Sequence, residues 1–196
     1  MYGQQCVYLK PKGNPFNAQI IYMKFFTFIS ILFFAVQVFA QDNETISWKD
    51  AKINNRIALT LSKSEFEEAY KKADSIVDAL PGETCSKDKN VMMLHYKGLK
   101  YELNNDLLNF RSIDFTRRRN MYISFKDEWF DNTTTLKSFA KTYPDAAAYI
   151  EDYENEQGEA FEIVTLYPTD IADLYEWRFF FKKGKLQLIE CKFTCP

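Results

Sequence analysis

The sequence predicts an α+β fold in which two tandem units, each a helix followed by an antiparallel hairpin, share one sheet with the helices packed on one face. Aromatic residues make up 17% of the chain, including 18 Phe and 12 Tyr, and such side chains favour the pleated surface of a sheet. Two segments with alternating apolar residues match each other, and a helix-start signal precedes each of them. These observations together predict the fold.

The matching segments are residues 98–115, GLKYELNNDLLNFRSIDF, and residues 176–193, EWRFFFKKGKLQLIECKF. Each alternates apolar and polar residues, has a polar turn in the middle and then alternates again, as a β-hairpin does. The alternation changes phase after Phe110 and after Leu188, and one extra residue in a β-bulge would cause such a change. The match predicts an internal duplication, although short hairpins also resemble one another by chance.

A short helix is expected before each hairpin. The first follows Ser62-Lys63-Ser64-Glu65, a capping box in which Ser62 and Glu65 satisfy each other's backbone N–H groups. The second can begin at Thr134 or Thr135, and an aromatic pair stands four positions apart on both helices: Phe66 and Tyr70, and Phe139 and Tyr143. We therefore expect an N-terminal linker at 41–56, a first unit at 57–125 and a second at 126–196, with further strands at 75–80, 92–96, 121–125 and 161–167.

Residues 23–42, MKFFTFISILFFAVQVFAQD, have the parts of a secretory signal peptide. Lys24 precedes an apolar run that ends in the small-residue site Val38-Phe39-Ala40. A membrane anchor is the alternative, but a span needs about 20 apolar residues, and this run is shorter and no basic cluster directly follows it. We expect cleavage after Ala40 and a mature chain that is periplasmic or secreted, with no membrane span after processing.

Residues 1–22 precede this leader and show no periodicity. The simplest interpretation is that they are translated upstream sequence and that Met23 is the true start, with an unusually long leader as the alternative. The Phe-rich leader ending in Ala-Gln resembles those of Bacteroidetes bacteria.

Three cysteines remain in the mature chain: Cys85, Cys191 and Cys195. An oxidising compartment favours one disulfide and leaves one thiol over. Cys191 and Cys195 lie on one expected strand, about 13 Å apart, which exceeds the limit of about 7 Å for bridged Cα atoms. Cys85 must therefore pair with one of them. We predict Cys85–Cys195, with Cys191 a buried thiol, and Cys85–Cys191 remains the alternative.

The sequence offers few parts for catalysis. His95 is the one histidine, and its place in an expected strand favours a structural role. There is no Gly-rich phosphate loop, nucleophile elbow or CxxC pair. The acidic stretch 150–159 lacks the ligand spacing of a calcium loop. A formal net charge of −2 without a basic block argues against nucleic acid as a partner. We expect no catalytic residue, no metal and no cofactor.

What remains is a surface. On the expected strand at 175–181, Arg178 and Phe180 share the face opposite to the core residues, and the repeat places Lys100 and Glu102 at the matching positions. An aromatic ring beside an arginine is typical of interface anchors, although such a face can also be covered by other elements. We predict an exported non-catalytic binding protein that uses this sheet surface for a protein partner. The alternative is a small-ligand-binding protein or enzyme with an aromatic-lined pocket.

Residues 59–75, LTLSKSEFEEAYKKADS, carry a family resemblance. The pattern of strand, capped helix and following turn resembles the tandem fold of β-lactamase inhibitor proteins and the SmpA/OmlA group of outer-membrane assembly lipoproteins. The resemblance implies an inhibitor or an envelope assembly role. Lys71 and Ala73 stand where the family pattern has Gly and Pro, and no cysteine stands at the cleavage site to receive a lipid.

Overall fold

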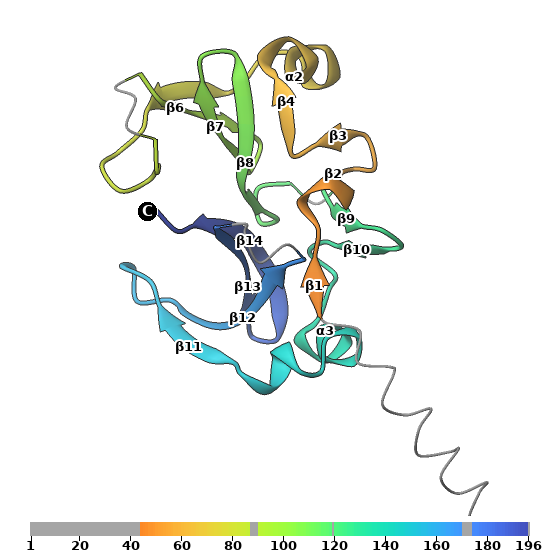
Figure 1. Cartoon of the computed structure of the whole chain (residues 1–196). Helices are drawn as coiled ribbons and strands as arrows, with labels where there is room; N and C mark the ends of the chain where they lie inside the picture. Colours follow the sequence, from red (N-terminus) through yellow and green to blue (C-terminus); the bar gives the residue numbers. More distant parts are fainter. Residues whose placement is uncertain (1–43, 87–89, 119, 170–173, 196) are drawn as a thin grey trace, which may run out of the picture. The chain divides into compact units, whose positions relative to one another are not determined.

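The computed structural model describes residues 44–86, 90–118, 120–169 and 174–195, which belong to one compact unit (Figure 1). The predicted signal peptide and upstream segment lie outside the described residues. Strand makes up 49% of the structure and helix 15%, and ten strands join in one mixed sheet. The predicted α+β arrangement of two helix-plus-hairpin units is therefore wrong. The chain forms strands where the sequence indicated connections, because short strands of two to four residues carry too little alternation to recognise.

The large sheet is built around the two expected hairpins. Its main path is β1 (Thr45–Ile46), β12 (Ala160–Pro168), β13 (Tyr175–Lys182), β14 (Lys185–Phe193), β8 (Leu107–Asp114), β7 (Leu99–Asn104), β6 (Met92–Tyr96) and β5 (Ser75–Asp78). Two further strands pair off this path, β11 (Glu151–Glu154) with β12 and β4 (Thr60–Ser62) with β8. The β1–β12 pair is parallel, and the other pairs of this sheet are antiparallel.

A four-stranded sheet and the helices lie on one side of the large sheet (Figure 1). The small sheet has the order β10 (Glu128–Phe130), β9 (Ile123–Phe125), β2 (Ala51–Ile53) and β3 (Ile57–Ala58). The described helices are α2 (Lys63–Tyr70), α3 (Leu136–Thr142) and the 3-10 turns η1 (Trp48–Asp50) and η2 (Ala146–Ala148). The segment expected to be a linker thus supplies strands of both sheets and three core residues: Ile46, Ala51 and Ile53.

Both helices begin where the sequence indicated. The Ser62 backbone N–H donates to Glu65 Oε2 at 2.7 Å, and the Glu65 N–H donates to Ser62 Oγ at 3.2 Å. The second helix uses Thr135 as its cap, in the same reciprocal arrangement with Ser138. These contacts satisfy donors that a helix start leaves without partners, so two short helices have defined first turns.

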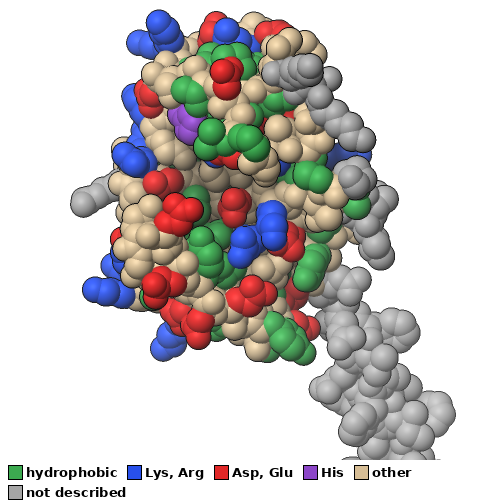
Figure 2. Space-filling model, turned by 90° about the vertical axis from the view of Figure 1, so that its left-hand side faces the viewer, with side chains coloured by type: hydrophobic (Ala, Val, Ile, Leu, Met, Phe, Trp, Pro, Cys, Tyr) green, Lys and Arg blue, Asp and Glu red, His purple; other side chains and the backbone are tan. Residues whose placement is uncertain are grey.

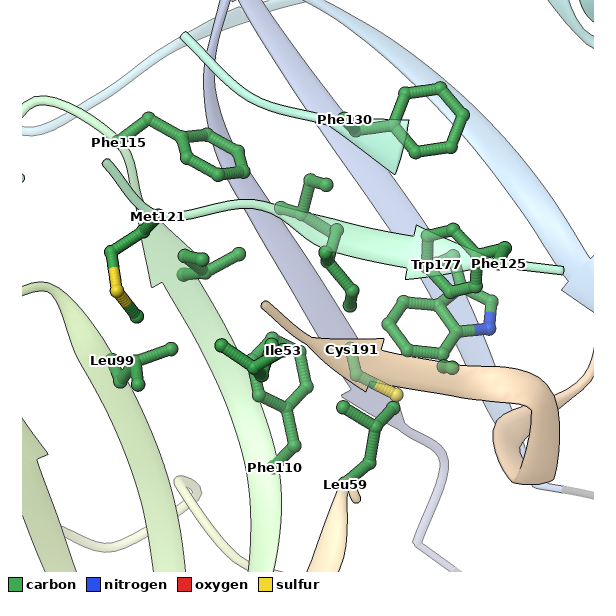
Figure 3. Close-up of a cluster of buried hydrophobic side chains, with 14 of the residues drawn as sticks. Ile53, Leu59, Leu99, Phe110, Phe115, Met121, Phe125, Phe130, Trp177 and Cys191 are labelled. Carbon is green, nitrogen blue, oxygen red and sulfur yellow. The ribbon is translucent and has the colours of Figure 1, made fainter. Parts of the chain in front are cut away.

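The core fills the space between the large sheet, the small sheet and the helices. Trp177 of β13 is fully buried, with its ring 5.1 Å from Phe125 of the small sheet and 6.1 Å from Phe110 of β8 (Figure 3). Each fully buried large apolar side chain contributes about 1.5–3 kcal/mol. Cys191 lies in this core as a free thiol, and burial raises its pKa. The predicted buried thiol is confirmed.

Both hairpins contain a bulge, but not at matching positions. In β7–β8, Arg111 is the extra residue, directly after Phe110 as predicted. In β13–β14 the register shifts between Phe180 and Phe181, which makes Gln187 the extra residue. The second bulge therefore comes before Leu188 rather than after it, and Leu188 turns away from the core face.

Candidate functional site

The face of the large sheet that points away from the core is the outer face. It faces left in Figure 1 and towards the viewer in Figure 2, and the described helices lie on the other side. Seven polar residues stand directly opposite one another across its strands, and we call them the polar row: Ser75, His95, Lys100, Ser112, Glu190, Arg178 and Thr165. With neighbouring strands about 4.8 Å apart, the row is roughly 29 Å long.

The polar row confirms that Lys100 and Arg178 share one face, as the repeat predicted. Lys100 is opposite Ser112, and Arg178 is opposite Glu190. Ser112 and Glu190 are opposite each other where the two hairpins meet. The residues that join the two predicted positions were not identified from the sequence, because the pairing of β8 with β14 is a long-range contact that no local pattern reports.

Arg178 sits in a small network of ion pairs. Its guanidinium lies 3.7 Å from Glu190 and 3.9 Å from Glu176, and Lys192 lies 3.7 Å from Glu176. Pairs of this kind, close to solvent, contribute little to folding stability. They instead hold the guanidinium in place, 5.2 Å from the centre of the Phe180 ring.

Phe180 itself is covered. It is 5% exposed, and its ring lies 5.9 Å from Tyr153 and 6.1 Å from Phe161. The cover comes from the edge strand β11, which the sequence did not reveal. Tyr153 of that strand is 42% exposed, so the aromatic group that solvent reaches is Tyr153, with Phe180 as its support.

Lys100 and Glu102 have different surroundings in the first hairpin. Lys100 donates to Glu83 Oε1 at 2.5 Å and keeps a partly exposed side chain. Glu102 is 7% exposed and pairs with Arg111, whose guanidinium also lies 4.1 Å from the centre of the Phe193 ring. Of the four predicted contact residues, Arg178 and Lys100 reach the surface, and Phe180 and Glu102 lie beneath it.

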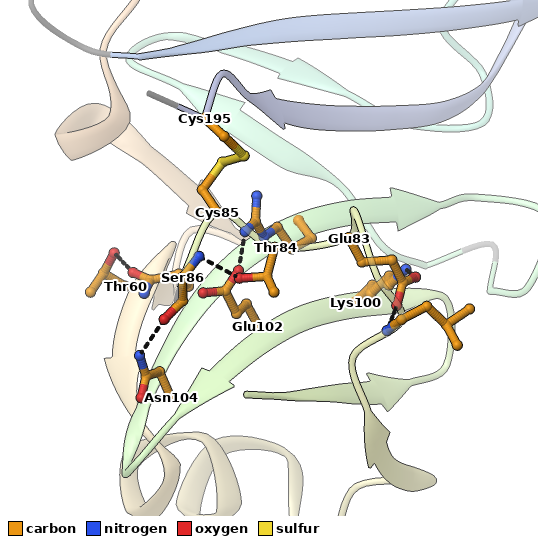
Figure 4. Close-up of polar contacts among 12 residues, drawn as sticks. Thr60, Glu83, Thr84, Cys85, Ser86, Lys100, Glu102, Asn104 and Cys195 are labelled. Atoms are coloured by element: carbon orange, nitrogen blue, oxygen red, sulfur yellow. Dashed lines mark hydrogen bonds and ion pairs between the residues drawn. A yellow bond between two sulfur atoms is a disulfide. The ribbon is translucent and has the colours of Figure 1, made fainter. Parts of the chain in front are cut away.

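A loop at residues 79–86, which we call the disulfide loop, covers Glu102 (Figure 4). The Cys85–Cys195 disulfide joins it to the C-terminal tail, with 4.9 Å between the Cα atoms. Glu83 holds the loop to Lys100, and Ser86 accepts a 3.4 Å hydrogen bond from Asn104. The predicted pairing of Cys85 with Cys195 is confirmed, and the loop closes one end of the outer face.

Two depressions hollow the outer face, and they share Lys100 and Ser112. The larger, of about 500 Å³, runs along the ends of β6 to β8 and reaches Leu188; the smaller, of about 250 Å³, lies under the disulfide loop. Figure 2 shows charged side chains of both signs around the hollow. Charged residues that line one or both are Asp74, Glu83, Lys97, Lys100, Arg111, Asp114, Arg117, Glu190 and Lys192.

The titratable groups of the hollow influence one another. Burial lowers the pKa of His95, and the nearby Lys100 ammonium lowers it further, while Glu83 opposes both. Partial burial alone would raise the pKa of Glu83, but the hydrogen bond from Lys100 and the backbone N–H of Leu80 outweigh it, so that pKa is lowered. The lowered pKa keeps the Glu83 carboxylate charged beside Lys100, and the lowered pKa of His95 holds its imidazole neutral near pH 7.

Within the described ranges, no group of three or more His, Cys, Asp or Glu residues is arranged to hold a metal ion. None of the helices in that part of the chain is long and apolar enough to cross a bilayer. No protein-family model, no curated protein and no solved structure matches the chain.

Proposed function

We propose that the chain is an exported, non-catalytic binding protein whose outer sheet face docks a protein partner. The observation that carries this proposal is the polar row with its two adjoining depressions, on the face opposite to the helices and the small sheet. Charged and aromatic groups at a concave surface are the elements from which specific interfaces are built. The signal-like leader and the Cys85–Cys195 disulfide support a periplasmic or secreted location.

Arg178 and Lys100 are the residues through which this face contacts the partner. Both are partly exposed and both are already oriented by carboxylates, so little side-chain freedom remains to be lost on binding. Tyr153 provides the accessible aromatic ring, and Phe180 and Glu102 support the contact residues from below. The weak family resemblance is compatible with an inhibitor or an envelope assembly factor.

Site-specific photo-crosslinking in the host cell tests the proposal. A photoreactive phenylalanine analogue replaces Ser112 or Thr165 on the polar row, and Lys137 on the exposed side of α3 is the control position. We expect the same partner adduct from both outer-face positions and none from Lys137. Arg178→Ala should lower the adduct yield about tenfold, as for an interface anchor, with no change in the amount of folded protein. Adducts only at Lys137 would place the interface elsewhere.

A further inference from the structure

A third cleft lies outside the outer face, between the β9–β10 hairpin and α3, and it shares no lining residue with either outer-face depression. Its volume of about 350 Å³ falls in the size range of small-ligand sites. The lining residues are Asp127, Glu128, Trp129, Phe130, Thr133, Thr134, Ser138, Phe139 and Thr142. Buried aromatic rings form part of this lining, and four hydroxyl side chains and two carboxylates form most of the rest.

Trp129 is the distinctive residue of this cleft. Along β10, Phe130 points into the core, with its ring 5.7 Å from Phe139, so strand alternation turns Trp129 outward. Its side chain is 66% exposed, whereas Trp177 is fully buried and Trp48 packs partly against the core. A solitary exposed apolar residue is ordinary, but Trp129 offers an accessible indole at the edge of a polar cleft.

Several polar groups of the cleft are free to bind. Asp127 and Thr142 are exposed, and the side chain of neither makes a hydrogen bond or ion pair within the described residues. Thr134 Oγ1 accepts a 3.1 Å hydrogen bond from the Asp131 N–H, which leaves its hydroxyl proton available. Glu128 accepts from the Tyr143 hydroxyl with one oxygen, Oε2, and a carboxylate has further acceptor sites.

We propose that this cleft binds a neutral pyranose unit of an oligosaccharide, either a hexose or an N-acetylhexosamine. A pyranose ring has an apolar face of C–H groups and an edge of hydroxyls. The flat indole, whose π face is negative, matches the C–H face, and the Asp127 carboxylate with the Thr134 and Thr142 hydroxyls matches the edge. Asp127 and Glu128 disfavour an anionic ligand. A quaternary ammonium ligand is recognised by several aromatic rings together, and Trp129 is the one exposed ring in the lining.

Calorimetric titration of the exported protein with maltopentaose, cellopentaose and chitopentaose tests this assignment. We expect at least one pentasaccharide to bind at millimolar concentration or below. Trp129→Ala should weaken that binding at least about tenfold, the effect of removing a central aromatic contact, and Asp127→Asn should weaken it by about fivefold through the lost charged acceptor. The matched control is Tyr149→Ala, an 81% exposed aromatic residue outside the cleft, which should leave the affinity unchanged.

Binding is expected to change the tryptophan emission as well, because the exposed Trp129 indole becomes covered while the core indole of Trp177 does not change. Failure of all three sugars to bind at millimolar concentration would overturn the proposal, and so would wild-type affinity in Trp129→Ala. The thermal midpoint of Trp129→Ala should match that of the parent, since the side chain is largely exposed. If that variant fails to fold, Asp127→Ala provides the same comparison. The presence or absence of sugar binding in this cleft does not test the proposal that the outer face docks a protein partner.

Discussion

The hairpins β7–β8 and β13–β14 share a strand pattern, but different structures cover their outer faces. Over β7–β8 the disulfide loop covers the buried Glu102–Arg111 pair, and Cys85–Cys195 and Lys100–Glu83 hold the loop in place. Over β13 an aromatic cluster of Tyr153, Phe161 and Phe180 covers the strand without any covalent link. The first cover depends on charge and a cross-link, and the second on apolar contact.

The difference shows that equivalent strand positions do not share a role. Glu102 and Phe180 correspond in the repeat, and both are buried on the outer face. One is a charged group that requires its Arg111 partner, and the other is a ring that requires neighbouring rings. The polar row that crosses between them remains accessible, so each cover stabilises one end of the same surface. Substitutions at four places on this surface measure these contributions to stability one at a time.

Removal of the disulfide should have the largest effect. The bond closes a loop with a sequence separation of 110 residues, and the chain-entropy model gives about 4–5 kcal/mol for a loop of this length. Cys85→Ser combined with Cys195→Ser should lower the free energy of unfolding by about this amount in urea denaturation at equilibrium. The double variant avoids a new free thiol beside Cys191. A loss below about 1 kcal/mol would show that the disulfide loop is held by its polar contacts alone.

Phe180→Ala should destabilise the aromatic cover of the second hairpin. Truncation of a buried Phe typically costs about 3–5 kcal/mol, and because Tyr153 is partly exposed and can collapse into the space, we expect about 2–3 kcal/mol. The control is Tyr167→Ala, which removes a 63% exposed ring from the same face of β12 and should cost less than about 0.5 kcal/mol. If Phe180→Ala leaves the thermal midpoint unchanged, the ring is not part of a stabilising cluster.

Glu102→Ala should destabilise the first hairpin by leaving the Arg111 guanidinium buried without its partner. The two side chains are 9% and 12% exposed, and loss of one partner of a buried pair costs about 3 kcal/mol or somewhat more. The contrasting variant combines Glu102→Leu with Arg111→Met and so removes both charges. It should leave the free energy of unfolding nearly unchanged. Equal losses in the single and double variants would mean that packing over Phe193, rather than charge, is what the pair provides.

Local signals in the sequence were sufficient for some elements. The capping box at Ser62, the helix start at Thr134 or Thr135, the strand at 92–96 and the extra residue after Phe110 all depend on neighbours within a few positions, which sequence patterns report directly. Strand length excluded a bond between Cys191 and Cys195, but it left open which of the two pairs with Cys85, and the structure decides for Cys195. The same local patterns did not define the fold class, because the strands β1, β2, β3 and β10 have two or three residues each and acquire their order only by pairing.

The candidate site depended on information that the sequence does not contain locally. Alternation along β13 placed Arg178 and Phe180 on one face correctly, but it could not show that β11 lays Tyr153 over Phe180. Likewise, the contact between Ser112 and Glu190 depends on the long-range pairing of β8 with β14. The residues of β11 itself, Glu151-Asp152-Tyr153-Glu154, have no alternation of apolar and polar side chains that would have indicated an edge strand.

The smallest effect should appear on the polar row as a pH dependence. The folded pKa of His95 is lowered by burial and by Lys100, so between that value and the unfolded value of about 6.5 the unfolded chain binds more protons. Stability therefore increases with pH through this window and is lost as the pH falls through it. The thermal midpoint should decline from about pH 7.5 to about pH 5.5 in the parent and decline less in His95→Gln. His95 is the one histidine of the chain, so the difference between the two curves belongs to it, and parallel curves would contradict a lowered pKa.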